Sequence, residues 1–169
     1  MSVKQGREFD KMQLGGSVTE LASYPLFCIL KLMGTDFVNL NYTSFMDYDL
    51  GVDLFSVINI HYPHALATGK VGLGVKSEGD LIISGTSGYI YVPSPWWKTE
   101  YFEVRFEDSN LNKKYYYKFE GDGLRYELSE FVKMIQTQRI VSSQLKSETS
   151  IAMAEIIEKF LKKEEVTYI

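Results

Sequence analysis

Apolar positions recur at helical spacing near the N-terminus, alternate through the middle of the chain, and return to helical spacing near the C-terminus. A first helix is predicted to begin at Ser17, because Ser17 and Glu20 match a capping box, and to end at Gly34. Pro25 lies inside this stretch, and proline lacks a backbone donor and crowds the preceding turn. We therefore expect either a bend at Pro25 or a second helical segment that begins at Tyr24.

The middle of the chain, from Asp36 to Phe119, alternates apolar and polar residues and is rich in Val, Ile, Tyr, Phe and Thr. Short turns separate the alternating runs. Connections of this length favour antiparallel neighbours, because parallel pairing needs a long crossover. The predicted strands are 38–45, 54–62, 65–75, 79–85, 88–92, 101–107 and 113–119.

Two more helices are predicted after the strands, the first starting around Gly123 and the second at Ser147. The last residues, Lys162–Glu165, are expected to be a solvated, fraying end. The apolar stripe of the first helix is Leu124, Leu128, Phe131, Val132 and Ile135; that of the second is Ile151, Ala154, Ile157 and Leu161, widened by Met153, Ile156 and Phe160.

This order of elements predicts an α+β fold, with an open, mostly antiparallel sheet and helices packed on one of its faces. With 169 residues, of which 45% are apolar and 24% charged, the chain is expected to form a single domain over residues 1–169.

Charge and cysteine content narrow the partners and the compartment. A net charge of −4 argues against a general nucleic-acid binder, which needs a cationic surface. No apolar run approaches the roughly 20 residues that cross a bilayer, so no membrane partner is expected. Cys28 is the single cysteine and cannot form an internal disulfide, which suits the cytoplasm.

Motifs for metal, nucleotide or nucleophilic chemistry are scarce. His61 and His64 are the only histidines, and their spacing does not indicate a metal site, so none is expected. The pattern of the glycine-rich stretch 69–74 predicts a strand, and no helix is predicted directly after it. It therefore cannot present amide groups and a helix dipole to a phosphate, and we exclude it as a nucleotide loop.

One strand suggests a covered second sheet face. Phe55 and Val57 lie on one face of the strand at 54–62, while Leu54, Ile58 and Ile60 lie on the other. Helices can cover only one of these faces. The open face either carries scattered surface apolar residues or packs against a second copy in a homo-oligomer. Seven of the 12 tyrosines fall between residues 89 and 126, and tyrosine is favoured at such partly wet interfaces.

Three segments, in matching order along the chain, resemble the C-terminal domain of the Gfo/Idh/MocA oxidoreductases, which include glucose–fructose oxidoreductase and inositol dehydrogenases. The stretch Gly15–Pro25 resembles the family's GG-x-L-x-D-x-G-x-[HY] segment, and Ile83–Ile90 resembles its I-x-G-T-x-G hairpin. The closing helical pair of the family is matched by Gly123–Phe131 with Ser143, Leu145, Ile151, Ile157 and Phe160.

The resemblance implies an open antiparallel sheet with helices on one face, and a sheet face that pairs subunits. Enzymes of the family carry, before this domain, a Rossmann domain with a GxGxxG loop for NAD(P) and a Glu-Lys-Pro segment with a catalytic lysine. Neither motif occurs here. NAD(P) is therefore implied for the full-length enzyme, while this chain alone is expected to bind no cofactor and to turn over no polyol.

By position, the two residues of the opening motif that take part in proton transfer fall on Glu20 and Tyr24. The resemblance thus implies that both are catalytic, with Tyr24 close to Trp96 or Trp97. Glu20 stands where the family usually has Asp, and Ala22 where it usually has Gly. The alternatives are that Glu20 only caps the helix and that Tyr24 is a core aromatic beside Pro25.

A second candidate element is the proline-stiffened loop that contains Trp96, Trp97 and Lys98. Aromatic faces stack on sugar rings, and a lysine can bind a hydroxyl or a phosphate, so these three residues are predicted to bind substrate. The alternative is that the tryptophans cover a sheet edge or an interface. Arg105 could pair with an anionic substrate, although surface salt bridges are more common.

Two function classes follow. The first is the C-terminal substrate-binding and oligomerisation domain of an NAD(P)-dependent sugar or polyol oxidoreductase. The second is a stand-alone, non-catalytic module that self-associates or binds a carbohydrate. A third hypothesis is an unrelated α+β ligand-binding fold whose matches to the family motifs are accidental.

Overall fold

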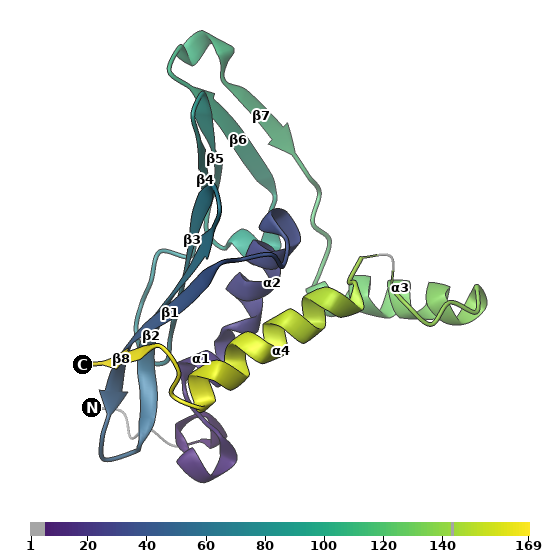
Figure 1. Cartoon of the computed structure of the whole chain (residues 1–169). Coiled ribbons are helices and arrows are strands. Elements are labelled where there is room, and N and C mark those ends of the chain that lie inside the picture. Colours follow the sequence, from purple (N-terminus) through teal and green to yellow (C-terminus); the bar gives the residue numbers. More distant parts are fainter. Residues whose placement is uncertain (1–5, 143) are drawn as a thin grey trace. The chain divides into compact units, whose positions relative to one another are not determined.

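The computed structural model describes residues 6–142 and 144–169, and its strands form two separate four-stranded sheets (Figure 1). Residues 6–76 and 144–169 form one compact unit, here called the first unit, and residues 77–142 form the second unit. The predicted α+β class with open, mostly antiparallel strand pairing is confirmed, although the strands form two sheets where a single sheet was expected. Ser143, which belongs to the closing helical motif, lies outside the described residues.

The helices and strands follow the predicted order with small shifts at their ends. The helices are α1 (Ser17–Leu21), α2 (Ser23–Met33), α3 (Gly123–Gln136) and α4 (Ser147–Leu161), with short 3₁₀ turns at Arg7–Phe9, Lys11–Gln13, Trp96–Lys98 and Ser109–Leu111. The strands are β1 (Asn39–Asp47), β2 (Val52–Tyr62), β3 (Ala65–Gly72), β4 (Leu81–Gly85), β5 (Gly88–Val92), β6 (Tyr101–Phe106), β7 (Lys113–Tyr116) and β8 (Val166–Tyr168).

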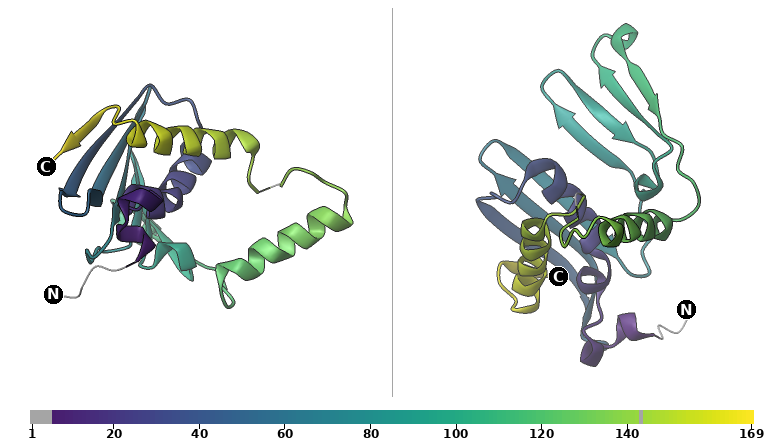
Figure 2. Two further views of the ribbon diagram at one scale, coloured as in Figure 1. Left: turned by 90° about the horizontal axis from the view of Figure 1, so that it is seen from below. Right: turned by 90° about the vertical axis from the view of Figure 1, so that its right-hand side faces the viewer.

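The sheet of the first unit has the strand order β3-β2-β1-β8. β1 pairs antiparallel with β2, and β2 pairs antiparallel with β3, as the short turns predicted. The helices α1, α2 and α4 lie on one face of this sheet and close the core there (Figures 1 and 2). The core consists of Val18, Ala22, Leu26, Leu30, Leu40, Tyr42, Ile58, Ile60, Val71, Ala152, Ile156 and Phe160.

Gly69 allows helix α2 to approach the sheet closely. A Cβ atom at this position would lie 3.2 Å from the Cβ of Pro25 and 3.8 Å from the Cδ1 of Ile29. A glycine inside a strand often marks such a close approach. Residues 69–72 of the glycine-rich stretch belong to strand β3, as predicted, and the strand ends before Leu73 and Gly74.

The capping box predicted at Ser17 and Glu20 is wrong. Helix α1 begins after Gly16, and no side chain of its own N-terminal residue caps it. Asp53 from strand β2 does so instead: its Oδ2 accepts the backbone N–H of Val18 at 3.0 Å. The hydroxyl of Ser17 also donates to this carboxylate. A carboxylate that is distant in sequence therefore replaces the local cap.

Pro25 lies in the first turn of α2, where the backbone N–H has no partner within the helix in any case. Ala22 separates α1 from α2. The second alternative, a new helical segment, is thus confirmed, and the segment begins at Ser23, one residue earlier than expected. Gly34 follows the last residue of α2 with a φ of 85°, as predicted for the end of this helix.

Helix α4 buries a face shifted from the centre of the predicted stripe: Ile156 and Phe160, which widened that stripe, are buried. Ile151 and Leu161, members of the predicted stripe, are exposed. The helix is apolar on more than one side, so its sequence alone does not select the face. The buried residues are Thr149, Ala152, Ile156 and Phe160, a set that includes a threonine and a small alanine.

The predicted fraying of the C-terminus is wrong. After α4 the chain turns through Lys162–Glu165, and residues 166–168 form strand β8, which pairs parallel with β1. The Tyr42 N–H donates to the Glu165 carbonyl at 2.9 Å, and the Ile169 N–H donates to the Ser44 carbonyl at 2.9 Å. A three-residue strand of this kind is too short to leave a clear alternating pattern.

The second unit contains an antiparallel meander with the strand order β4-β5-β6-β7, followed by helix α3 (Figure 2, right). Among the residues that the structure describes, Val92 is its one buried apolar side chain. The apolar residues of α3 predicted from the sequence are all exposed.

Candidate functional site

Tyr24 lies in the first turn of α2 with 57% of its surface exposed. Within the described residues, its phenol hydroxyl makes no hydrogen bond. The alternative of a core aromatic is therefore wrong. An exposed phenol at the start of a helix can reach a bound molecule and can donate or accept a proton there.

Glu20 lies on α1, and its side chain is largely buried, with 17% exposed. Arg7, in the first 3₁₀ turn, donates to the Glu20 carboxylate at 2.6 Å. The alternative that Glu20 merely caps α1 is wrong, because Asp53 occupies the cap. The pairing keeps the Glu20 carboxylate beside the Arg7 guanidinium.

A buried polar cluster anchors the helix that carries Glu20. Asp53, Ser17, Ser44 and Ser56 are all buried, and Asp53 is 3% exposed. The Ser56 hydroxyl donates to Asp53 Oδ2 at 2.8 Å, and the two hydroxyls of Ser44 and Ser56 lie 2.8 Å apart. Gly16 is required beside this cluster, because a Cβ there would lie 2.2 Å from Asp53 Oδ1 and the glycine φ is 130°. Sequence reasoning missed Asp53, which is distant from α1 along the chain.

Trp96 and Trp97 lie together on a 3₁₀ turn of the second unit, with ring centroids 6.1 Å apart and planes at 86°. Two hydrogen bonds hold the turn in place. The Trp96 N–H donates to the Gly79 carbonyl at 3.1 Å, and the Thr99 hydroxyl donates to the Trp96 carbonyl at 2.6 Å. Trp97 is 51% exposed. The loop therefore presents one aromatic surface on a well-anchored turn.

Lys98 follows the two tryptophans and donates to the Asp122 carboxylate at 2.9 Å. This hydrogen bond holds the pKa of Asp122 below its ordinary value. Both side chains are substantially exposed, and an exposed ion pair of this kind contributes little to stability. The pair can therefore open at little cost, which leaves Lys98 able to bind a ligand.

The predicted residues fall into two groups. Tyr24 and Glu20 belong to the first unit, and Trp96, Trp97 and Lys98 belong to the second. The structure brings the last three together in one turn.

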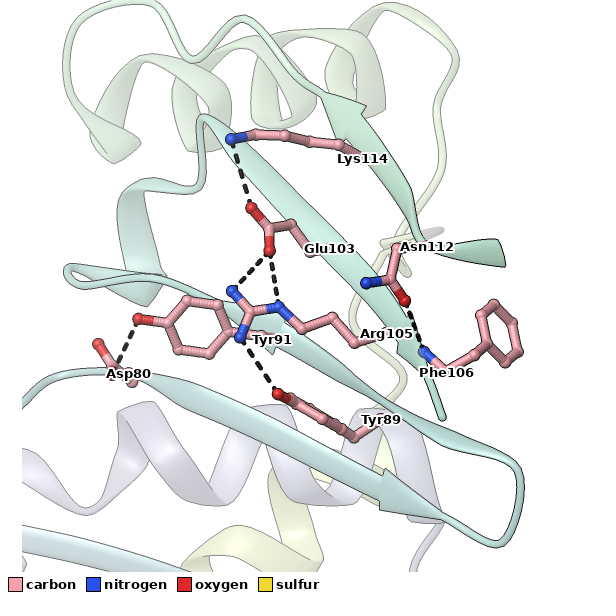
Figure 3. Close-up of polar contacts among 8 residues, drawn as sticks. All are labelled: Asp80, Tyr89, Tyr91, Glu103, Arg105, Phe106, Asn112 and Lys114. Carbon is pink, nitrogen blue, oxygen red and sulfur yellow. Dashed lines mark hydrogen bonds and ion pairs between the residues drawn. The ribbon is translucent and has the colours of Figure 1, made fainter. Parts of the chain in front are cut away.

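One face of the second unit's sheet carries tyrosines interleaved with charges (Figure 3). The pairing register places Tyr89 opposite Arg105, Tyr91 opposite Glu103, and Glu103 opposite Lys114. We call this surface the tyrosine face; it consists of Tyr89, Tyr91, Tyr101, Glu103, Arg105, Lys114 and Tyr116.

Glu103 joins the two cations of the tyrosine face (Figure 3). Its carboxylate lies 2.6 Å from Arg105 Nη2 and 3.3 Å from Lys114 Nζ. The hydrogen bond from Arg105 holds the pKa of Glu103 below its ordinary value, and the bond from Lys114 acts in the same direction. Arg105 is thus part of a surface salt bridge, the more common of the two roles considered for it.

The cations also lie over the tyrosine rings. The Arg105 guanidinium is 4.7 Å from the ring centroid of Tyr91, and Lys114 Nζ is 3.6 Å from that of Tyr101. Each cation is attracted by the negative face of the aromatic ring beneath it. The sequence showed that tyrosines are frequent in this segment. It did not show which cations lie over which rings, because that depends on the register between the strands.

The open face of the first unit's sheet is mixed in character. Phe45 is 51% and Leu66 is 66% exposed. Across the centre of the face, Asn59 donates to Asn41 at 3.1 Å and Thr68 donates to Asn59 at 2.9 Å. Apolar side chains and a polar ladder therefore share the surface, as on interfaces that are part apolar and part wet.

Neither a metal nor a dinucleotide fits the residues at hand. No group of three or more metal-ligating side chains occurs among residues 6–142 and 144–169. The glycines at 69 and 72 lie inside strand β3, so this glycine-rich stretch does not form the strand-to-helix turn that binds a dinucleotide phosphate. We derive no chemical step through NAD(P). No helix in this described part is both long and apolar enough to cross a membrane.

Comparison with solved structures relates this geometry to known proteins. KijD10, a 3-ketoreductase from Actinomadura kijaniata in complex with NADP and TDP-benzene, matches with a TM-score of 0.78 and 9% identity over 99% of this chain and 52% of its own. The chain has the fold of the C-terminal half of KijD10 and of a second solved structure, an oxidoreductase. The oxidoreductase named yhhX matches with a TM-score of 0.63 and 14% identity over 87% of this chain and 48% of its own.

The chain therefore spans about half the length of the solved structures that it matches. No family model matches the sequence, and no curated protein does. The fold expected from the resemblance to Gfo/Idh/MocA oxidoreductases is confirmed.

Proposed function

We propose that this chain is the C-terminal, substrate-binding and oligomerisation half of an NAD(P)-dependent sugar or polyol oxidoreductase, and that it is not catalytically competent alone. The observation that carries the proposal is the match of 99% of the chain to half of a 3-ketoreductase that binds NADP and TDP-benzene. The exposed phenol of Tyr24 and the anchored tryptophan turn supply residues suited to such a role.

In this proposal Tyr24 exchanges a proton with a substrate oxygen. The hydroxyl is free to do so, because it is not engaged in the core. Glu20, held by Arg7, adds a negative charge on the preceding helix. A phenol needs hydrogen-bond reach, about 2.6–3.2 Å, of the oxygen that it serves. In the intact enzyme, Tyr24→Phe should lower turnover by roughly 10²–10⁴-fold and leave cofactor affinity almost unchanged.

Trp96, Trp97 and Lys98 bind the substrate in this proposal. The exposed Trp97 ring offers a face for a sugar ring, and Lys98 offers a donor to a hydroxyl or a phosphate once its bond to Asp122 opens. The chain has just two tryptophans, and both lie in this turn. Tryptophan fluorescence therefore reports directly on the proposed site.

A fluorescence titration tests the binding role. A TDP-sugar, a free hexose and myo-inositol are each added to the purified chain, and we expect at least one to change the tryptophan emission in a saturable way. Lys98→Ala should weaken the binding, and Leu111→Ala, an exposed apolar position elsewhere in the same unit, should not. No saturable change with any of the three ligand classes would contradict the substrate-binding role.

A titration with NADH tests the claim that the chain is half of an enzyme. We expect no saturable change in NADH fluorescence, because cofactor affinity in this architecture resides in a glycine-rich strand-to-helix turn, whereas the glycine-rich stretch of this chain runs through strand β3. Saturable binding at micromolar concentrations would overturn the assignment.

We further propose that the chain forms a homo-oligomer through the open face of its sheets. The exposed Phe45 and Leu66 and the tyrosine face support this. Sedimentation equilibrium at tens of micromolar should show a mass above that of the monomer. The double variant Phe45→Lys/Leu66→Lys should lower that mass, and a monomeric wild type would contradict the proposal.

A second candidate is a stand-alone module that self-associates or binds carbohydrate without catalysis. The exposed Trp97 on a rigid turn suits it equally well. The coding region upstream of Met1 separates the two: a Rossmann fingerprint followed by a Glu-Lys-Pro segment there would identify half of an enzyme.

A further inference from the structure

The ion pair between Lys98 and Asp122 combines a hydrogen-bond donor and an acceptor next in sequence to the exposed Trp97. Lys98 Nζ donates to Asp122 Oδ1 at 2.9 Å, and the two side chains are 46% and 83% exposed. An ammonium group carries three N–H donors, and a carboxylate has two oxygens that can each accept more than one bond. The bond between the two side chains uses only part of this capacity, so the pair can still donate to and accept from a bound molecule.

The geometry of the pair matches two hydroxyl groups on adjacent carbon atoms. Nζ and Oδ1 are 2.9 Å apart, and two hydroxyl oxygens in a gauche arrangement are separated by a similar distance. One hydroxyl oxygen can accept from Lys98 while the other hydroxyl donates to Asp122, because a hydroxyl is both donor and acceptor. A doubly ionised phosphate has no proton to donate to the carboxylate and is repelled by it.

The turn Trp96–Lys98 is held in one conformation by the start of strand β4 and the residue before it. The Asp80 carboxylate accepts the Ser94 N–H at 2.9 Å, just before the turn. Gly79 lies against the Trp97 ring: a Cβ there would be 3.7 Å from Trp97 Cζ3 and 2.8 Å from Ser94 Oγ, and the glycine φ is 72°. A ring and a backbone that are already ordered lose little conformational freedom when a ligand binds.

The charges along the segments that form this region disfavour an anionic ligand. Residues 77–100 and 118–125 together carry three cationic side chains and five acidic ones, so their net charge is negative. Lys98 is the one cation of residues 77–100, and Asp122 already pairs with it. A neutral ligand with hydroxyl groups meets no such electrostatic cost.

We propose that Asp122 determines the specificity of the tryptophan turn: with Lys98 it binds two hydroxyls on adjacent carbons of a neutral sugar or polyol, and it disfavours phosphorylated and nucleotide-linked sugars. This inference rests on the substrate-binding role proposed above for the turn, and it adds a charge state and a hydroxyl pattern to the ligand. A ring with equatorial hydroxyls fits best, because it presents C–H bonds to the Trp97 face and hydroxyls at its rim.

The first test compares three ligands that share one sugar skeleton, by tryptophan fluorescence titration of the purified chain. Methyl glucoside has hydroxyls on adjacent carbons, methyl 3-deoxyglucoside has none on adjacent carbons, and methyl glucoside 6-phosphate keeps them and adds charge. We expect saturable binding of methyl glucoside. The 3-deoxy compound and the phosphate should each bind about fivefold more weakly, the first through a lost hydrogen bond and the second through repulsion.

The second test changes the carboxylate alone. Asp122→Asn keeps an acceptor and removes the charge, so it should leave the affinity for methyl glucoside within about threefold and raise that for the 6-phosphate about fivefold. Asp122→Ala also removes the acceptor and should weaken methyl glucoside about fivefold. The Asp122 side chain makes no capping hydrogen bond to α3, so circular dichroism should show unchanged helix content in both variants.

Glu107→Gln is the matched control for the charge change. Glu107 is exposed and follows the end of strand β6, whereas the tryptophan turn precedes the start of that strand. Six residues of extended chain span roughly 20 Å, which puts Glu107 beyond the reach of the turn. The variant should leave all three dissociation constants within about twofold of the wild-type values.

Three results would each overturn the inference: equal binding of methyl glucoside and its 3-deoxy form, tighter binding of the 6-phosphate by the wild type, or an Asp122→Asn variant with the wild-type preference. A chain that binds a TDP-sugar but not methyl glucoside would also overturn it, while the substrate-binding role of the turn would stand. If none of these ligands, nor a free hexose or myo-inositol, gave a saturable change, the inference and that role would fail together.

Discussion

The carboxylate of Asp53 is the residue on which the candidate site of the first unit depends most. It lies at the start of strand β2, is 3% exposed, and accepts from the Val18 N–H and from the hydroxyls of Ser17 and Ser56. A buried carboxylate is tolerated only when it is fully hydrogen-bonded. Here its partners tie α1 to the sheet and so fix the position of Glu20.

Asp53→Ala should lower the free energy of unfolding by about 3 kcal/mol, because it leaves a helix N-terminus and two buried hydroxyls without their acceptor. Urea denaturation followed by circular dichroism checks this. The control is Asp10→Ala: Asp10 also accepts a backbone N–H at a helix start, but it lies near the surface, and the loss should be clearly smaller. Equal losses at the two positions would contradict the role given to Asp53.

Glu103 should make the second unit sensitive to acid. Folding lowers its pKa below the ordinary value of 4.5, because Arg105 and Lys114 bind the ionised carboxylate. Its contribution to stability is therefore full above that value and is lost as the pH falls through the lowered, folded-state pKa. The stability difference between wild type and Glu103→Gln should be constant near neutral pH and shrink in acid. A difference that does not depend on pH would show that the pairing contributes nothing.

At the scale of elements, features that depend on neighbouring residues were predictable from the sequence, and features that depend on distant residues were not. The end of α2 at Gly34 and the start of α4 at Ser147 were predictable, because each depends on residues that are neighbours in sequence. The residue that caps α1 was not predictable, because it comes from the distant strand β2. The buried face of α4 was not predictable either, because that helix has apolar residues on several sides and packing on the sheet selects among them.

Strand β8 gives a prediction at this scale. It covers the edge of β1, and Val166 packs against the core. Ending the chain after Glu164 should expose the unpaired edge of β1, lower the free energy of unfolding by about 2–3 kcal/mol, and promote aggregation. Thermal unfolding and light scattering measure both effects. If the truncated chain were as stable and as soluble as the full one, β8 would contribute nothing to the stability of the sheet or to the protection of its edge.

At the scale of the whole molecule, the two units differ in the amount of core they hold. Among the residues described, every buried apolar side chain except Val92 belongs to the first unit. Regions with few buried apolar contacts open at lower free energy than the core. The second unit is stabilised more by strand pairing and by the tyrosine face than by a sealed interior.

We therefore expect two transitions on denaturation. Both tryptophans lie in the second unit, so tryptophan fluorescence follows that unit alone, whereas far-ultraviolet circular dichroism follows both. The fluorescence transition should come at a lower urea concentration than the main dichroism transition. Superimposed curves would show that the two units unfold as one.

The sequence by itself determined the class of fold and most of the strands, because alternation, helical spacing and turn residues are local properties. Tyr24 and Glu20 became candidates through the resemblance to the Gfo/Idh/MocA oxidoreductases, and Trp96, Trp97 and Lys98 through the chemistry of their loop. The tertiary structure alone decided which carboxylate caps α1, which face of α4 is buried, that the C-terminus adds a parallel strand, and how Arg105 and Lys114 lie over the tyrosines. Each of these depends on residues that are distant in sequence and meet only through strand register and helix packing.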